Sequence, residues 1–532
     1  MKSTGSGIII LIFILAFRSL NLLSQSPGSG LYVIWYQNNK SPLDVPFITG
    51  GQVVVQWRDV DLDEGTYDFS SIARELHFLK EKRKMTTIQI NGNLKPEWLF
   101  RVVPYFPGKL SVQVRDERGT LMYWHPIHLQ AYRKMLDAFG SFLEKCEDRD
   151  AVLGIRMNFN AIGTEHMNVP PEARDLKNWI IPAGDTIAEE WTQVLAKTYE
   201  TTVVNTFIEK VGPHLRVFVR NNIKPDIEEY YRKHFNNGTL AWFHTSSEAE
   251  PHSAGTEIQY RRFIEYCRSG KTVGYAEPWA SAWGDHGNST PDDRWCSPPQ
   301  WNYWRLLLDL HCGVSFIALY ANDLNVALSG KYAGKYDENR DKLGYMGEFM
   351  EAFTFTHKYA GLHASPEKSP GAWIAFRGND TILAKNTGIT PTQRKLSYLT
   401  GDYNFLMERL PDKTLAEHNI GPPEQRFGAW ARLLPAGESI KIKTDERFAG
   451  SLKKGSIRII FYNPVRHGSN SFRVITNGTK RKIEYDYTGR WETVTVQLPK
   501  GPLVKAGDGS HIIIKSGSEP LYFHMVEVNN LQ

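Results

Sequence analysis

Short apolar runs alternate with helical patterns up to about residue 365 of the chain. Most of the runs are apolar on both faces, as expected for parallel strands buried between a barrel interior and a helix layer. The pattern predicts eight strands, over residues 31–36, 52–57, 86–90, 152–159, 215–219, 239–243, 272–276 and 314–319. Eight strands that alternate with helices predict an α/β fold, the (β/α)8 barrel.

Apolar residues recur every three or four positions between these runs. This spacing predicts helices over residues 69–82, 127–144, 189–210, 227–235, 257–267, 298–311 and 341–359. Helix stop signals precede the fifth, sixth and seventh strands, at Gly212-Pro213, Asn236-Asn237-Gly238 and Ser269-Gly270. No helix is predicted after the first strand, where residues 41–51 have the composition of a loop.

The pattern of apolar and polar residues along the chain changes after residue 364. Short runs alternate apolar and polar residues and are separated by Gly, Asn and Pro, which predicts an antiparallel β-sandwich over residues 365–532. Strands are predicted over residues 439–443, 456–462, 471–475, 491–497, 511–515 and 521–528. Residues 486–499 resemble the later strands of carbohydrate-binding jelly rolls. The barrel is expected to occupy residues 27–364.

Residues 1–26 have the pattern of a secretory signal peptide. Lys2 precedes an unbroken apolar run of ten residues, Ile8 to Phe17, and small polar residues follow near Ser24 to Ser26. A bilayer span needs about 20 apolar residues, so we expect cleavage and a secreted or periplasmic protein without stable membrane insertion. An uncleaved N-terminal anchor is the alternative.

Length, composition and charge narrow the class of protein. A chain of 532 residues exceeds a single core, and 41% apolar with 23% charged residues is an ordinary globular balance. Residues 370–532 carry a net charge of +8 and the rest −3, which fits either an anionic polymer ligand or ordinary solubility charge. No signature of a nucleic-acid-binding fold is present, so nucleic acid is not expected as a partner. The sequence does not indicate an oligomeric state.

The four cysteines, Cys146, Cys267, Cys296 and Cys312, have no metal-ligand spacing. Cys267 and Cys312 fall on helices predicted to be neighbours, so a disulfide and two buried thiols both fit. His125 and His128 lack a third ligand nearby, and the chain contains no glycine-rich phosphate loop. We therefore expect neither a metal nor another cofactor.

Two glutamates follow predicted strands, Glu165 after the fourth and Glu277 after the seventh. Parallel barrels perform their chemistry at the carboxyl ends of the strands. Other residues near the strand ends are flat aromatics or hydrogen-bonding side chains, which match the C–H faces and hydroxyl groups of sugars. The expected substrate-binding residues are Trp35, Trp57, Arg58, Asn91, Asn160, His166, Arg220, His244, Trp279, Trp283, Tyr320 and Asn322.

The two glutamate positions match those of clan A of the glycoside hydrolases, which the chain resembles over roughly residues 30–330. The stretches Trp57-Arg58-Asp59-Val60-Asp61 and Glu64-Gly65-Thr66-Tyr67-Asp68-Phe69 are similar to the segment after the second strand in family 42 and family 35 β-galactosidases. The resemblance implies a retaining enzyme with Glu165 as acid/base and Glu277 as nucleophile. The chain departs from the clan at Thr164, where an Asn normally contacts the sugar, and Asn158 or Asn160 is a candidate substitute.

The sequence thus predicts a secreted glycosidase that takes part in polysaccharide degradation, with a galactan-like substrate that is either neutral or sulfated. Arg58 or Arg220 is expected to keep the nucleophile ionised. The main alternative is a non-catalytic carbohydrate-binding protein on a degenerate barrel. A further alternative is an inverting enzyme or lyase that pairs Glu165 with a different carboxylate, for which Glu248, Glu250 and Glu97 are candidates.

Overall fold

The structure is a computed structural model of the whole chain. It describes residues 28–220, 225–245, 257–269, 273–278, 281–282, 297–332, 335–336, 345–377, 401–422, 425–465 and 470–531. The expected signal peptide therefore lies outside the described residues. No helix in the described part of the chain is long and apolar enough to cross a membrane.

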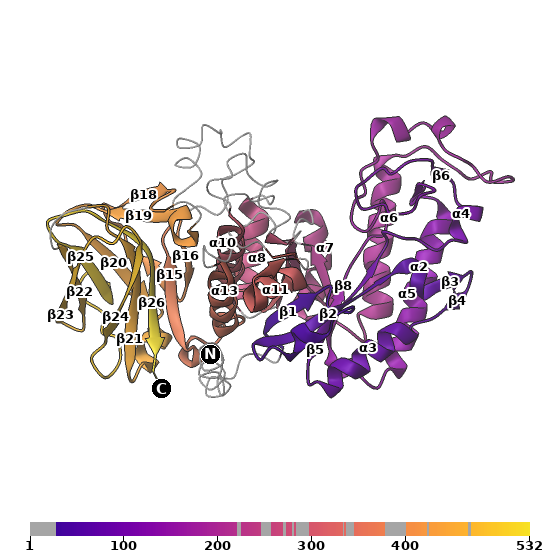
Figure 1. The fold of residues 1–532 in the computed structure, drawn as a ribbon. Coiled ribbons are helices and arrows are strands. Elements are labelled where there is room, and N and C mark those ends of the chain that lie inside the picture. The colour runs from indigo at the N-terminus through magenta and orange to yellow at the C-terminus, as the bar shows by residue number, and fades with distance from the viewer. Residues whose placement is uncertain are drawn as a thin grey trace, which may run out of the picture. The chain divides into compact units, whose positions relative to one another are not determined.

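Eight parallel strands form a closed barrel, and each matches one of the predicted strands. Four of them, β1, β2, β5 and β8, are labelled in Figure 1. They are β1 (Gly30–Ile34), β2 (Ile48–Gln56), β5 (Met85–Asn91), β8 (Val152–Arg156), β9 (Val217–Arg220), β10 (Leu240–Thr245), β11 (Gly274–Glu277) and β12 (Phe316–Tyr320). Their order around the barrel is the order along the chain, as expected when each strand is followed by a crossover that packs outside. The (β/α)8 prediction is confirmed.

All seven predicted helices are present, with ends that differ by a few residues. They are α3 (Ser70–Glu81), α5 (Pro126–Lys145), α6 (Gln193–Thr206), α7 (Pro225–Asn236), α8 (Glu257–Arg268), α10 (Pro298–Cys312) and α13 (Tyr345–Tyr359). Helix α6 continues as one π-helical turn, η5 (Phe207–Val211). Helix α10 illustrates the local signals: Ser297 and Gln300 form a capping box, and Gly313 ends the helix at a φ of 84°.

Some elements between the strands were not predicted. The segment after β1 contains the 3-10 turn η1 (Ser41–Asp44), but β2 already begins at Ile48, inside the expected loop. Helix α11 (Ala321–Ser329) follows β12 directly. The remaining short elements are α2 (Trp57–Val60), α4 (Leu99–Val102), and the two-stranded pairs β3 (Asp61–Asp63) with β4 (Thr66–Tyr67), β6 (Tyr105–Phe106) with β7 (Thr120–Leu121), and β13 (Lys331–Tyr332) with β14 (Lys335–Tyr336).

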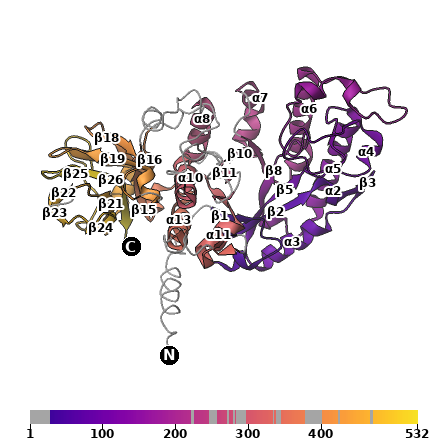
Figure 2. The same ribbon diagram turned by 45° about the horizontal axis from the view of Figure 1, so that its top comes forward.

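The C-terminal region consists of two antiparallel sheets that share one apolar core (Figure 2). One sheet contains β15 (Gly371–Ala375), β16 (Tyr403–Phe405), β18 (Leu415–His418), β19 (Trp430–Leu434), β21 (Gly455–Tyr462), β24 (Trp491–Gln497) and β26 (Leu521–Asn530). The other contains β17 (Met407–Arg409), β20 (Ser439–Thr444), β22 (Asn470–Thr476), β23 (Thr479–Tyr485) and β25 (Ile512–Ser516). Inward side chains such as Ile440, Ile442 and Phe472 alternate with outward polar residues, and this pattern is the one that predicts a sandwich.

The chain divides into two compact units. The first comprises Tyr32–Leu43 and Thr49–Phe243 and carries β2, β5, β8 and β9. The second comprises Met1–Leu31, Asp44–Ile48 and His244–Gln532 and carries β11, β12 and the antiparallel sheets. In the second unit Cys267 and Cys312 are buried free thiols, so they do not form the disulfide that was one of two expectations.

Candidate active site around Glu165

The loop after β8 folds back on itself and presents Glu165. Asn160 (φ 50°) and Gly163 (φ 65°) adopt left-handed conformations, and main-chain hydrogen bonds join Asn160 to Thr164 and Ile162 to His166. A side chain at Gly163 would meet the Cβ of Gln113 at 2.4 Å. Position 163 thus needs glycine twice over, for its φ and for the close approach of the neighbouring loop.

Side chains from the segments that follow β5 hold the main chain of this loop. The Oε1 atom of Gln113 accepts hydrogen bonds from the backbone N–H of Thr164 (3.1 Å) and of Glu165 (2.9 Å). The Thr164 hydroxyl donates to Asn93 Oδ1 at 2.8 Å. The Lys95 ammonium group donates to the carbonyl oxygen atoms of Gly92 and Gly163 (2.8 and 3.0 Å). These bonds fix the backbone position from which the Glu165 side chain extends.

The Glu165 carboxylate is held by two guanidinium groups. Its Oε1 atom forms an ion pair with Arg156, and its Oε2 atom lies 2.6 Å from Nη1 of Arg220. The Arg156 side chain is only 7% exposed and lies over the ring of Phe243, whereas that of Arg220 is 34% exposed. Two neighbouring cations that donate to a carboxylate stabilise its ionised form.

Glu165 opens onto a cavity of about 770 Å³ within the first unit. Helix α6 and the segment before it line one wall, and the β8 loop lines the other. The lining residues are Leu110, Met157, Phe159, Glu165, His166, Met167, Asn168, Trp191, Gln193, Ala196, Lys197, Glu200 and Arg220. The wall combines apolar and aromatic surface with a few charged groups, as is typical of ligand pockets.

Three of the predicted site residues are brought together here: Glu165, His166 and Arg220 all line the cavity. The ring of His166 is hydrogen-bonded to the Ser111 hydroxyl. Burial, and then the positive charge of Arg220, hold the pKa of His166 below its ordinary value. His166 is therefore a neutral hydrogen-bonding group at neutral pH.

Glu277 ends β11 in the second unit. The Tyr275 hydroxyl donates a hydrogen bond to its Oε2 atom at 2.6 Å. This bond holds the carboxylate in one orientation at the end of the strand. Trp279 and Trp283, predicted to follow it, lie outside the described residues.

The prediction that Trp57 offers its face to a sugar is not supported, because the indole is completely buried. Its Nε1 atom donates to Asp61 Oδ2 at 3.0 Å, and its ring packs against Tyr132 at 4.8 Å. Trp98 donates to the other oxygen of Asp61, and burial raises the pKa of this carboxyl group to about 6. In this structure Trp57 is a core residue at the start of α2, directly after β2.

Asn91, Asn160 and His244 are also buried. The Asn158 amide donates to Asn91 Oδ1 and to the Ile90 carbonyl oxygen (3.1 and 3.0 Å), and the Asn160 amide donates to the same carbonyl oxygen at 3.2 Å. The asparagines therefore connect β5 to the segment after β8. Both side chains are buried at these bonds, so in this state neither Asn158 nor Asn160 is exposed to replace the sugar-contacting Asn that Thr164 substitutes. The His244 ring packs against Phe263.

The remaining predicted residues are partly or well exposed at or near strand ends. Trp35 follows β1 with its side chain 47% exposed. Arg58 lies 3.5 Å from Glu97 Oε1, so it pairs with a carboxylate other than the predicted nucleophile. Tyr320 and Asn322 are half-buried at the start of α11. The backbone N–H of Ala282 donates to both carboxylate oxygen atoms of the adjacent Asp323. Burial raises the pKa of this carboxyl group to about 7.

The sequence did not single out several residues that line the Glu165 cavity or hold Glu165 in place. Arg156 was a detectable signal, because it is a charge within an otherwise apolar strand. Gln113 lies in a long irregular segment and Glu200 lies on a helix face, where a polar side chain is the ordinary case. Trp191 and Lys197 are similarly unmarked in the sequence. Glu200 is a second carboxylate in the cavity of Glu165 that was not among the candidates.

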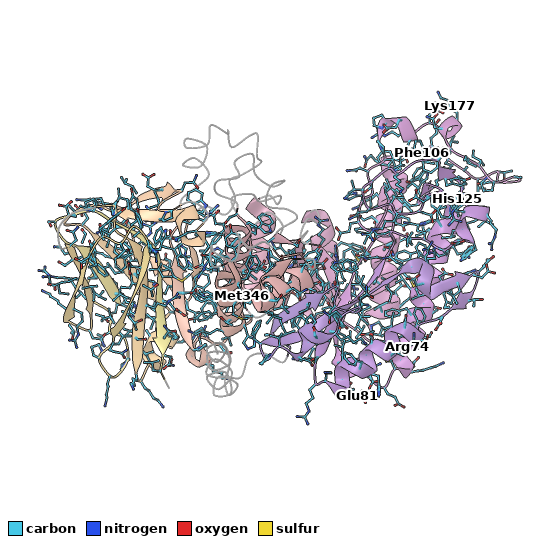
Figure 3. The ribbon with its side chains drawn as sticks, viewed as in Figure 1. Arg74, Glu81, Phe106, His125, Lys177 and Met346 are labelled. Atoms are coloured by element: carbon cyan, nitrogen blue, oxygen red, sulfur yellow. The ribbon has the colours of Figure 1, made fainter. Side chains whose placement is uncertain are left out.

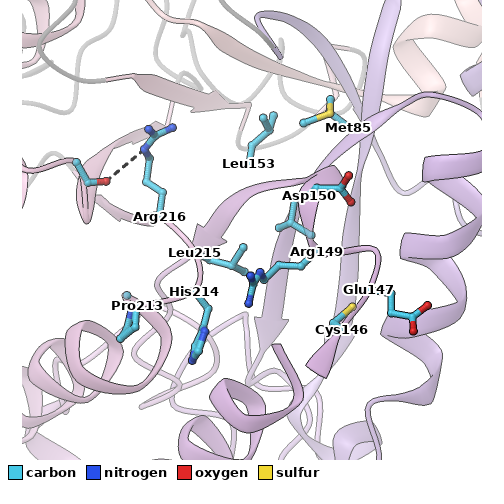
Figure 4. Close-up of a pocket in the computed structure, with 13 residues that line it drawn as sticks. Met85, Cys146, Glu147, Arg149, Asp150, Leu153, Pro213, His214, Leu215 and Arg216 are labelled. Atoms are coloured by element: carbon cyan, nitrogen blue, oxygen red, sulfur yellow. Dashed lines mark hydrogen bonds between the residues drawn. The ribbon is translucent and has the colours of Figure 1, made fainter. Parts of the chain in front are cut away.

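A separate cavity of about 640 Å³ lies at the amino ends of β8 and β9 (Figure 4). Its arginines serve the fold: Arg149 donates to the Leu143 carbonyl oxygen and Arg216 to that of Gly238. Parallel barrels place catalytic groups at the opposite strand ends. We therefore assign the cavity in Figure 4 no catalytic role.

His125, which precedes α5 (Figure 3), has its Nε2 atom 3.2 Å from Asp185 Oδ2. Burial holds the pKa of His125 below its ordinary value even though Asp185 acts in the opposite direction. Among the described residues, no group of three or more His, Cys, Asp or Glu side chains is arranged to hold a metal ion.

No protein-family model and no curated protein matches the chain. The matching solved structures include xylanase B from Clostridium stercorarium F9, which is 14% identical (58% of this chain, 90% of that chain, TM-score 0.31). A GH5-4 broad specificity endoglucanase from Clostridum cellulovorans is 10% identical (62% and 94%, TM-score 0.33). A carbohydrate binding module from Cellvibrio mixtus lichenase 5A is 16% identical (24% and 91%, TM-score 0.16). At these identities and TM-scores the similarity supports no further argument, and the barrel is established by the order of its strands.

Proposed function

We propose that the protein is a glycoside hydrolase that cleaves an oligo- or polysaccharide with retention, using Glu165 and Glu277 as its two carboxylates. One observation carries the proposal: Glu277 ends a strand of the closed parallel barrel, and Glu165 lies in the loop that follows the carboxyl end of another. Those strands, β8 and β11, are the fourth and seventh of the eight. Such barrels hold their catalytic residues at these ends.

In the proposed reaction Glu277 attacks the anomeric carbon while the bond to the leaving oxygen breaks and Glu165 gives that oxygen its proton. A water molecule then loses a proton to Glu165, and its oxygen displaces Glu277 from the sugar. Both carboxyl groups return to their starting states. The hydrogen bond from Tyr275 supports the role of Glu277, because it orients the carboxylate that attacks.

The role of Glu165 as acid requires a change in its surroundings. A general acid must carry a proton, whereas Arg156 and Arg220 favour the ionised form of this carboxyl group. Arg220, one of two arginines expected beside the nucleophile, is paired with Glu165. Release of Arg220, the more exposed of the two arginines, is the smallest rearrangement that makes protonation of Glu165 easier.

The finer parts of the proposal rest on the sequence. Galactose-type sugars are favoured by the resemblance to family 42 and family 35 β-galactosidases, and the aromatic strand-end residues suit sugar rings. We propose secretion or periplasmic export after removal of residues 1–26. In this scheme residues 27–364 form the catalytic barrel, and residues 365–532 form the accessory sandwich.

A second candidate function is carbohydrate binding without catalysis. The observation that favours it is the same pair of arginines, because a permanently ionised Glu165 suits a structural ion pair better than an acid. In that case the cavity lined by Trp191 and Met157 binds a sugar that is never cleaved.

Hydrolysis assays on a panel of galactans, xylans and glucans, with the product anomer followed by NMR, test the proposal. We expect retention, and a loss of about a thousandfold in kcat for Glu277→Gln and for Glu165→Gln. Glu172→Gln is the matched control, because Glu172 is an exposed carboxylate of the 3-10 turn η3 (Pro171–Ala173). Sugar binding without turnover of any glycan selects the second candidate. Inversion at the anomeric centre points to a different carboxylate partner, of which Glu200 is the nearest candidate in the cavity.

A further inference from the structure

Arg216 is a cation directly before β9, in the otherwise apolar run from Leu215 to Val219. It is half-buried and lines the cavity at the amino ends of β8 and β9 that Figure 4 shows. Its Nε atom donates a long hydrogen bond, 3.4 Å, to the carbonyl oxygen of Gly238. Within the described part of the chain, the N–H groups of its Nη atoms have no protein acceptor.

No carboxylate among the described residues forms an ion pair with Arg216. Burial alone lowers the pKa of Arg216 below its ordinary value, because no anion acts in the opposite direction. Two carboxylates, Glu147 and Asp150, line the same cavity, but Asp150 pairs with Lys80 at 2.8 Å. Cations that are taken out of water are ordinarily paired, since desolvation of a lone charge is costly. Arg216 thus has the capacity to bind an anion from solution.

The cavity offers space and further polar groups for such an anion. Its volume of about 640 Å³ lies within the range of small-molecule sites. Arg149 also lines it and donates to the Leu143 carbonyl oxygen at 3.1 Å, and its guanidinium has no ion-pair partner in the residues that the structure describes. His214 adds an imidazole to the wall, and Leu153 adds apolar surface.

We propose that this cavity is a binding site for a sulfate or phosphate group, which Arg216 holds through its Nη atoms. Such a group has more acceptor oxygen atoms than a carboxylate, so it can accept from the fork of one guanidinium and keep oxygen atoms for another donor of the cavity. It belongs either to a free ion or to an ester on a sugar. The site lies at the amino ends of the strands, whereas Glu165 follows a carboxyl end, so the inference does not depend on hydrolysis.

Thermal unfolding of the full chain in phosphate, sulfate or chloride at equal ionic strength tests the site. We expect phosphate or sulfate to raise the Tm of the wild type in a saturable way, because a ligand that binds only the folded chain stabilises it. Galactose 6-sulfate, titrated in the same way, separates the sources. Half-saturation at about tenfold lower concentration than inorganic sulfate identifies an ester ligand, and equal half-saturation identifies the free ion.

Arg216→Met should abolish the saturable rise and leave the Tm in chloride at least as high, since it removes a half-buried charge without an ionic partner. Arg101→Met is the matched control, because it makes the same change at an exposed arginine of the same unit outside the cavity. An equal saturable rise in wild type and Arg216→Met would overturn the inference, because sulfate then acts by exclusion from the whole surface. No rise beyond chloride in the wild type would overturn it too.

Arg216→Lys keeps the test decisive even where the methionine variant does not fold. Lysine retains the charge without the planar fork, so half-saturation should need about tenfold more phosphate or sulfate than in the wild type. An unchanged half-saturation would show that the anion binds elsewhere. Circular dichroism of each variant checks that the fold is kept.

Discussion

Glu165 is a residue at which stability and chemistry are difficult to separate. Its carboxylate is the anion that compensates the buried charge of Arg156, in addition to any role in bond cleavage. Removing one partner of a buried ion pair leaves an uncompensated charge, and the free energy of unfolding falls more than the pair itself is worth.

The first prediction concerns this charge balance. Glu165→Gln should lower the free energy of unfolding by about 3 kcal/mol, because it breaks the buried ion pair with Arg156. Urea denaturation of the full chain measures the loss. The double variant Glu165→Gln with Arg156→Met should recover most of it, since the buried charge is removed too. A single variant as stable as the wild type would contradict the interpretation of Arg156 as a charge compensated by Glu165.

At the scale of elements, the site depends on the contact between the loop after β8 and the segments that follow β5. Gln113 accepts both backbone N–H groups at the base of Glu165, and Asn93 accepts the Thr164 hydroxyl. The left-handed turn at Gly163 is what brings these donors to Gln113. The barrel strands set the approximate location of Glu165, and this loop contact sets its orientation.

The second prediction tests the loop contact. Gln113→Leu leaves two backbone donors without an acceptor, so it should destabilise the chain by about 2 kcal/mol and lower kcat/KM about tenfold. Thermal unfolding and initial rates on the best substrate measure the two effects. Val112→Ala is the control in the same segment, because its side chain is 91% exposed and should change neither quantity. A Gln113→Leu variant with unchanged kcat/KM would show that the loop does not position Glu165.

At the scale of the whole molecule, the second compact unit joins the last barrel helices to the antiparallel sheets. Tyr303 of α10 donates to His524 of β26 at 2.8 Å, and Lys358 and Tyr359 of α13 both donate to Glu527. Burial acts to raise the pKa of Glu527, but Lys358 and Arg458 outweigh it and the pKa lies below its ordinary value. Buried polar bonds of this kind indicate that the sheets are part of one cooperative unit with these helices.

The third prediction follows from the burial of His524. Burial lowers the pKa of His524 from 6.5 to about 3, so between these values the unfolded chain binds a proton that the folded chain does not. The free energy of unfolding therefore falls as the pH falls, by about 2 kcal/mol between pH 7 and pH 5 from this residue.

His524→Gln should remove this part of the pH dependence, because glutamine does not titrate and keeps an acceptor for the Tyr303 hydroxyl. Urea denaturation at pH 7 and pH 5 compares the two slopes. Gln497→Ala, at an exposed residue of β24 that does not titrate, is the control and should leave the slope of the wild type unchanged. Equal slopes for wild type and His524→Gln would show that His524 is protonated in the folded state.

The sequence predicted strands and helices well wherever burial of one or both faces gives the apolar residues a regular spacing. All eight barrel strands and seven helices follow from apolar runs and three-or-four spacing, because a strand buried on two faces leaves few polar residues. Short edge strands such as β17 and β18 were not predicted, because three or four residues are too few to show an alternating pattern. Glu165 and Glu277 were candidates because each follows a predicted strand.

By itself the sequence thus determined which residues build the barrel, and it predicted that two glutamates, Glu165 and Glu277, follow its strands. Only the tertiary structure decided the environment of Glu165, because Arg156, Arg220 and Gln113 reach it from three different segments of the chain. The same holds for Trp57, which reads as a ligand-binding aromatic in the sequence and is a buried core residue in the fold. Periodicity records on which side of an element a residue lies, whereas ionisation and exposure depend on neighbours that are remote along the chain.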